Sequence, residues 1–150
     1  MGWMRTPRSR GVRLRTRTSR VVHYHLDNDV LVYACASAGS ERKRLLRLVD
    51  SDDVELGISA VAWYEFCRGP RTGEQLAVAR AFFGEEGIVP FDERIAERAG
   101  EVFRLLGSPR KRGADIAIGV TAVLADARLL TRNRRDFAGI QDLRIEVVGV

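Results

Sequence analysis

Short runs of strand-forming residues alternate with segments of helical periodicity along this chain, and this alternation limits its fold more than any other feature. Five runs predict strands, at residues 21–26, 54–58, 87–91, 128–131 and 144–148. Helices are predicted between them, at residues 27–36, 41–49, 59–68, 73–83, 92–106 and 114–127. Strands that alternate with helices form parallel sheets with helices on both faces. The predicted fold class is therefore α/β, with three α/β/α layers around a central, mainly parallel sheet of four to five strands.

Positive charge is concentrated at the start of the chain. Residues 1–20 hold seven arginines and no acid, whereas residues 21–150 hold 18 basic and 20 acidic side chains, a net charge of −2. The first segment also lacks apolar periodicity, so we expect a disordered arginine-rich extension followed by one folded domain over residues 21–150. Two interpretations of the extension stay open, a basic arm that binds RNA and an over-extended gene start. The net charge of +5 for the whole chain therefore does not indicate that the folded part binds nucleic acid.

The sequence disfavours membrane proteins, zinc proteins and nucleotide-cofactor proteins. The longest apolar run, residues 116–125, is too short to cross a bilayer, and no apolar segment of a signal peptide follows the arginines. Cys35 and Cys67 are far apart and fit neither a zinc motif nor a disulfide framework. The chain contains no phosphate-binding loop and no dinucleotide-binding motif. We therefore expect a cytoplasmic protein with no membrane partner.

Acidic and amide side chains fall where predicted strands end or where the helices beside them begin. Four separated segments contribute such candidates, which are Asp27 with Asp29, Glu65, Asp115, and Asn133 with Asp136. Glu65 stands out because its helix is otherwise apolar. In open parallel sheets the functional site lies at the carboxyl ends of the strands. These side chains are therefore expected to meet at one edge of the sheet.

Close carboxylates repel one another, and a divalent cation between them offsets the repulsion. Oxygen ligands of this kind favour Mg²⁺ or Mn²⁺. Each candidate also has a purely structural interpretation. Asp27, Asp29 and Asp115 could cap helices, and Glu65 could form a salt bridge. Residues 133–136 could be an ordinary turn.

These segments resemble the motifs of the PIN-domain family, and of its VapC toxins in particular. Residues 26–32, Leu-Asp-Asn-Asp-Val-Leu-Val, resemble the first motif of the family. Residues 58–69 and 115–122 resemble the second and third. Residues 130–137, Leu-Thr-Arg-Asn-Arg-Arg-Asp-Phe, resemble the fourth and are the most specific of the set. The resemblance covers residues 22–148.

The resemblance implies a PIN-like fold and a Mg²⁺-dependent endoribonuclease, with Mn²⁺ as an alternative cation. Such an enzyme cleaves single-stranded RNA with a metal-activated water and is the toxin of a type II toxin–antitoxin pair. The implied partners are RNA, a cognate antitoxin protein and a second copy of the chain in a homodimer. The implied metal ligands are Asp27 and Asp115. The implied catalytic set is Asp27, Glu65, Asp115, Asn133 and Asp136.

One departure from the family pattern concerns the number of metal ions. Many relatives have an aspartate where this chain has Asn133, and an amide binds a second metal ion less strongly, although Asp136 could compensate. Basic side chains near the acids are expected to contact the RNA phosphates. The expected substrate-binding residues are Thr131, Arg112, Arg132 and Arg134. The alternative is that these arginines belong to solvated loops.

Two other functions compete with the nuclease. A non-catalytic PIN-like module that binds RNA or protein is favoured by Asn133 and opposed by Glu65, because a degenerate site has no reason to keep a lone acid. A haloacid-dehalogenase-like phosphatase would use an opening like that at Asp27 and Asp29. That family also needs a threonine or serine, a lysine and an acidic pair in fixed order, which this sequence does not provide.

Overall fold

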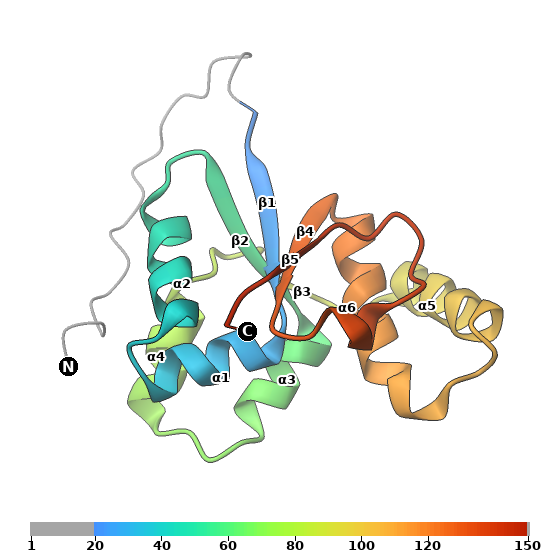
Figure 1. Ribbon diagram of the computed structural model, residues 1–150, viewed down its shortest axis with the longest axis horizontal. Helices are drawn as coiled ribbons and strands as arrows, with labels where there is room; N and C mark the ends of the chain where they lie inside the picture. Colours follow the sequence, from blue (N-terminus) through green and yellow to red (C-terminus); the bar gives the residue numbers. More distant parts are fainter. Residues whose placement is uncertain (1–19, 150) are drawn as a thin grey trace.

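The computed structural model describes residues 20–149 and confirms the α/β class (Figure 1). The predicted extension lies outside the described residues, apart from Arg20, and stays a prediction. Five strands form one sheet in which every neighbouring pair is parallel. In chain order they are β1 (Val22–Leu26), β2 (Val54–Ser59), β3 (Ile88–Val89), β4 (Ala127–Thr131) and β5 (Ile145–Val147).

Helices cover both faces of this sheet, as the alternating pattern predicts. They are α1 (Asn28–Ala36), α2 (Ser40–Asp50), α3 (Ala60–Cys67), α4 (Gly73–Ala81), α5 (Glu93–Leu105) and α6 (Gly113–Leu124), with 3₁₀ turns η1 (Arg110–Arg112) and η2 (Arg134–Phe137). Figure 1 shows α2 on the left of the strands and α5 and α6 on the right. Among the described residues, no helix has the length and apolar character that a bilayer crossing needs.

The order of the strands fixes where a site can form. From one edge to the other the order is β3, β2, β1, β4, β5. The chain therefore runs outward from β1 to β3 and then returns, through α5 and α6, to the other side of β1. The reversal point lies between β1 and β4, and open parallel sheets bind ligands at the carboxyl ends of the strands at such a point. The register there pairs Leu26 with Leu130.

Apolar side chains fill the space between the sheet and its helices. Leu26, Ile58, Leu129 and Leu130 are fully buried. The helix expected to be apolar nearly all round, α6, is buried continuously over residues 116–122 because it lies between the sheet and α5. Since α6 leads directly into β4 and packs against it, its first residues lie at the carboxyl end of the sheet.

Some predicted boundaries are wrong by a few residues. The third strand was expected over residues 87–91 but covers only Ile88–Val89. Pro90 follows, and a proline has no N–H to donate to a neighbouring strand. The helix expected over residues 73–83 ends at Ala81, and the one expected over 114–127 ends at Leu124. The expected helix caps Ser59 and Asp92 are confirmed, because their side chains accept hydrogen bonds from Val61 and Ile95 N–H groups.

The Ser59 cap gives a test of how α3 is held. Its hydroxyl accepts a 3.1 Å hydrogen bond from Val61 N, and the residue is 1% exposed. Ser59→Ala is expected to lower the free energy of unfolding by about 1 kcal/mol, because the helix loses a capped N–H. Urea denaturation would measure the change. Ser51→Ala is the matched control, since the Ser51 side chain makes no hydrogen bond within residues 20–149, and an equal loss in both variants would contradict the capping role.

Candidate active site

Asp27 and Thr131 form the centre of the candidate site, where β1 and β4 end side by side. The Thr131 hydroxyl donates a 2.8 Å hydrogen bond to Oδ2 of Asp27. Both residues are buried, Asp27 with 5% exposed and Thr131 with 0%. Burial is the main cause that raises the pKa of Asp27 from 3.8 to about 7. The charges of Asp29 and Asp115 act in the same direction, whereas the hydrogen bond from Thr131 opposes them.

Asp115 enters the site from the start of α6. Burial raises the pKa of its carboxyl group from 3.8 to about 6, and the charges of Asp136, Glu65 and Asp29 raise it as well. The guanidinium of Arg112 acts in the opposite direction. Asp115 therefore lies within electrostatic reach of four other acids, since its charge also raises the pKa of Asp27.

Glu65 lies on α3, with its side chain 20% exposed. Burial raises the pKa of Glu65, Arg68 lowers it, and the charge of Asp29 raises it. Arg68 approaches the carboxylate to 3.6 Å, so the predicted salt bridge is present together with the coupling to other acids. Each of five acids interacts electrostatically with at least one of the others, and we call them the carboxylate group, which is Asp27, Asp29, Glu65, Asp115 and Asp136.

Helix capping does not account for the two central aspartates. Asp27 occupies the N-cap position of α1, but its side chain makes no capping hydrogen bond. Asp115 is the third residue of α6, and the cap position of that helix is taken by Arg112. Both carboxylates are therefore free of the structural role that the sequence allowed for them.

Asn133 and Asp136 lie on the turn after β4. The Asn133 N–H donates a 3.1 Å hydrogen bond to the Thr131 hydroxyl, which ties the turn to the end of the strand. The Asn133 side chain is exposed and makes no hydrogen bond within residues 20–149. The charge of Asp136 acts on Asp115, so Asp136 belongs to the carboxylate group.

The arginines predicted to contact substrate all have partners inside the chain. Arg112 donates to the backbone carbonyls of Asp136 and Ala138 and thereby joins the start of α6 to η2. Arg134 donates to the carbonyl of Ile145 at 3.4 Å.

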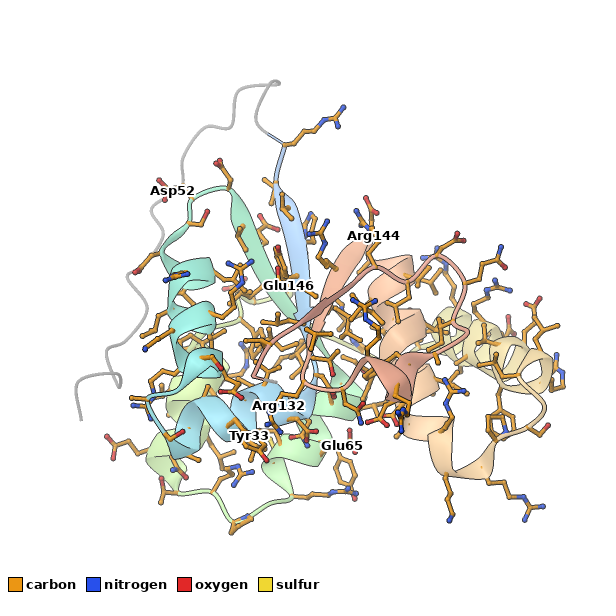
Figure 2. The ribbon with its side chains drawn as sticks, viewed as in Figure 1. Tyr33, Asp52, Glu65, Arg132, Arg144 and Glu146 are labelled. Carbon is orange, nitrogen blue, oxygen red and sulfur yellow. The ribbon has the colours of Figure 1, made fainter. Side chains whose placement is uncertain are left out.

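Arg132 is the most constrained of the three arginines. Its guanidinium bonds the carboxylate of Glu41 at 3.0 Å and the carbonyl of Gly149 at 3.2 Å. It also covers the ring of Tyr33, with Cζ 3.5 Å from the centroid. Figure 2 labels Arg132 and Tyr33, which are in contact, at the carboxyl end of the strands.

Sequence reasoning missed three residues near the site. The amide oxygen of Asn28, next to Asp27, is buried and has no hydrogen-bond partner among the described residues. The position of Asn28 between two aspartates at the end of a strand could have marked it as a site residue. Glu41 is 5% exposed and holds Arg132, although the sequence places it among the charged residues of an amphipathic helix. Arg68 faces Glu65 at the helical spacing of three residues, which marks such pairs in sequence.

The donor chemistry of the carboxylate group suits a hard divalent cation, since its ligating atoms are carboxylate oxygens. Burial is the main cause of the raised pKa values of Asp27 and Asp115, and repulsion by neighbouring acids adds to it. A divalent cation would offset that repulsion. Within residues 20–149, however, no three histidine, cysteine, aspartate or glutamate side chains already stand close enough to form a metal site. The residues therefore fit a cation in charge and atom type, and a bound cation would have to draw their side chains closer together.

Comparisons with known proteins agree with this architecture. The sequence model of the PIN domain matches residues 24–143. The structure of VapBC2 from Rickettsia felis, bound to a DNA fragment from its promoter, superposes with a TM-score of 0.65 at 21% identity, over 85% of this chain and 100% of that one. A toxin–antitoxin complex from Klebsiella pneumoniae gives a TM-score of 0.60 at 25% identity, over 79% of this chain and 92% of that one.

A third similar structure is DNA-bound VapBC from Salmonella typhimurium. Its TM-score is 0.61 at 20% identity, with 85% of this chain and 98% of that chain covered. Among curated protein sequences, none matches this chain significantly.

The raised pKa of Asp27 predicts how stability depends on pH. In the folded state the carboxyl group of Asp27 keeps its proton up to about pH 7, whereas in the unfolded state it loses the proton near pH 3.8. The free energy of unfolding should therefore fall as the pH rises across this interval. Asp27→Asn removes the charge but can still accept the bond from Thr131. In EDTA at about pH 8 the variant should be more stable than wild type by roughly 1–3 kcal/mol, with no gain near pH 4.

Chemical denaturation at the two pH values measures this difference. The exposed Asp53, which precedes β2 at the opposite end of the sheet, provides the matched control Asp53→Asn. If Asp27→Asn is less stable than wild type at the higher pH, the charge of Asp27 does not destabilise the folded state.

Proposed function

The chain belongs to the PIN domain family, and from that membership and the carboxylate group we propose that it is a metal-dependent endoribonuclease that hydrolyses single-stranded RNA. The observation that carries the proposal is Asp27, a buried acid at the reversal point of the sheet whose pKa is raised to about 7 in company with other acids. Burying such a charge destabilises a fold, so its presence at a ligand-binding position points to function.

Asp27 and Asp115 are the residues we propose as ligands of Mg²⁺, with Mn²⁺ as an alternative. A bound divalent cation supplies neutralising charge to a phosphodiester oxygen and makes a nearby water more acidic. The Thr131 hydroxyl holds the carboxylate of Asp27, and we assign Thr131 this positioning role. Because Thr131 is completely buried, this role suits it better than direct contact with RNA. Arg112 offsets part of the negative charge around Asp115.

Glu65 is the proposed group that orients the attacking water or accepts its proton. A carboxylate whose pKa is raised by burial is a better base than an exposed one. The proposed reaction adds water to a phosphorus atom and breaks its bond to the 3′ oxygen, which leaves a 5′-phosphate and a 3′-hydroxyl. Asp136, through its charge, helps keep the pKa of Asp115 high until the cation is bound. Asn133 is the proposed polar contact at the exposed rim of the site.

A protein antitoxin is the proposed partner, and the chain is the proposed toxin of the pair. The support is that the similar structures from Rickettsia felis and Salmonella typhimurium are VapBC complexes and that the one from Klebsiella pneumoniae is a toxin–antitoxin complex. A cytoplasmic location and a homodimer belong to the same proposal.

Cleavage of RNA tests the proposal directly. Purified wild type, free of any antitoxin, is incubated with a mixed set of single-stranded RNAs in Mg²⁺ or in EDTA. Cutting is expected only with Mg²⁺, and Asp27→Asn and Asp115→Asn are each expected to lower the rate by about 100-fold or more. Asp53→Asn should cut at the wild-type rate. Folded wild type that cuts none of these RNAs would favour the non-catalytic binding module.

Binding of the cation gives a second test that does not depend on cleavage. Because Asp27 and Asp115 must lose protons to bind a cation, Mg²⁺ should raise the melting temperature of wild type more at about pH 8 than at about pH 6. The increase should disappear in Asp27→Asn. Thermal unfolding of both proteins in Mg²⁺ and in EDTA measures this increase in melting temperature. An equal increase in both proteins would place the cation elsewhere.

A further inference from the structure

Two tyrosines, each with an arginine against its ring, border the carboxylate group. Tyr33 is 42% exposed and Tyr64 is 61% exposed, and both belong to the large hydrophobic side chains that remain at the surface. Arg132 lies over the ring of Tyr33 at 3.5 Å, and Arg68 lies over the ring of Tyr64 at 5.4 Å. Both distances are within the range of cation–π attraction.

Tyr33 is joined to the site through α1. It follows Asp29 by four residues, so the two side chains lie on the same face of the helix. The charge of Asp29 acts on Asp27, Glu65 and Asp115. The ring of Tyr33 therefore lies one helical turn from the acid that is coupled to the rest of the carboxylate group.

The Tyr33 ring is also held in a fixed orientation. Arg132 covers one face, and that arginine is itself held by the buried carboxylate of Glu41 and by the carbonyl of Gly149. A guanidinium fixed in this way leaves the ring little freedom to turn. An aromatic ring that is ordered before binding loses less conformational entropy when a ligand stacks on it.

Tyr64 is joined to the site through α3. Arg68 contacts both its ring and the carboxylate of the adjacent Glu65, at 3.6 Å from Oε2. The Arg68 side chain is 58% exposed, so its guanidinium can still reach a phosphate. An exposed ring, an exposed cation and a site acid thus occur within five residues of one helix.

We propose that Tyr33 and Tyr64 are stacking platforms for the unpaired bases of RNA that is bound at the carboxylate group. This inference rests on the proposed function, because it assigns the substrate contacts of the same site. Bases of single-stranded RNA offer free ring faces, and stacking on aromatic side chains needs no particular sequence. Beside Tyr64, the exposed guanidinium of Arg68 complements the phosphate that accompanies a base. Beside Tyr33, Arg132 holds the ring in place instead. In a duplex the faces of the bases are already covered, so the platforms select single strands.

The test measures RNA binding in a protein that cannot cut. The full chain carrying Asp115→Asn is titrated against a fluorescein-labelled single-stranded RNA of mixed sequence, in Mg²⁺, and anisotropy gives Kd. A matched strand with abasic residues at its centre keeps the phosphates and removes the bases. Tyr33→Ala and Tyr64→Ala remove each ring, whereas Tyr33→Phe and Tyr64→Phe keep it.

Each alanine variant is expected to weaken binding of the base-containing strand by about 5- to 100-fold. The phenylalanine variants should stay within about 2-fold of the parent protein, because the ring is kept. On the abasic strand all five proteins should bind alike. The abasic strand also accounts for any purely electrostatic binding by the arginines of residues 1–20.

Four results would overturn the inference. One is an alanine variant that binds like its phenylalanine counterpart, and another is an equal loss on the abasic strand. The third is a change from dimer to monomer in sedimentation with unchanged RNA affinity, which would make the rings a contact between two copies of the chain. Absence of any RNA binding would overturn it too.

The outcome is separable from that of the nuclease proposal. Wild type that cleaves RNA while binding does not depend on either ring refutes the platforms and keeps the nuclease. Binding that depends on the rings, in a protein whose wild type cuts no RNA, keeps the platforms and refutes the nuclease.

Discussion

A buried carboxylate held by a hydroxyl from the neighbouring strand is the interaction on which the candidate site depends. The parallel register of β1 and β4 places Thr131 beside Asp27, and one hydroxyl then serves both as donor to the carboxylate and as acceptor for the Asn133 N–H. Strand, acid and turn are thereby fixed by a single group. Because the acid is buried among other acids, its protonated form suits the fold better than its charged form, and the proposed cation would neutralise the charged form.

The arginines near this edge of the sheet brace the backbone as well as offset charge. Arg112 connects the start of α6 to the carbonyls of Asp136 and Ala138, at the end of the turn that carries Asp136. Arg132 joins segments that are far apart in sequence, since Glu41 begins α2 and Gly149 lies at the end of the chain. Arginine suits such positions because its planar fork of donors can satisfy several acceptors at once. Arg68 is of particular interest for RNA, because it is 58% exposed and lies beside the carboxylate of Glu65.

The sequence was sufficient for the fold class, the element order and the edge of the sheet at which the acids gather. Those features follow from hydrophobic periodicity and from the topology of parallel sheets, which local patterns encode. It was not sufficient for the partners of individual arginines. Whether Arg132 faces RNA or Glu41 depends on how α2 and the last strand are placed in space, and no local pattern carries that placement. The short β3 and the buried, unpartnered oxygen of Asn28 likewise depend on neighbours distant in sequence.

Electrostatics also explains why aromatic contacts matter for the proposed substrate. RNA is a polyanion, the carboxylate group is anionic, and residues 21–150 have a net charge of −2. Long-range attraction by the folded domain is therefore weak, and the arginines of residues 1–20 are the main concentration of positive charge. A cation at Asp27 and Asp115 would offset repulsion only at the phosphate it contacts. Binding of the flanking nucleotides must then come from interactions that do not depend on net charge, and stacking of uncharged bases on Tyr33 and Tyr64 is such an interaction.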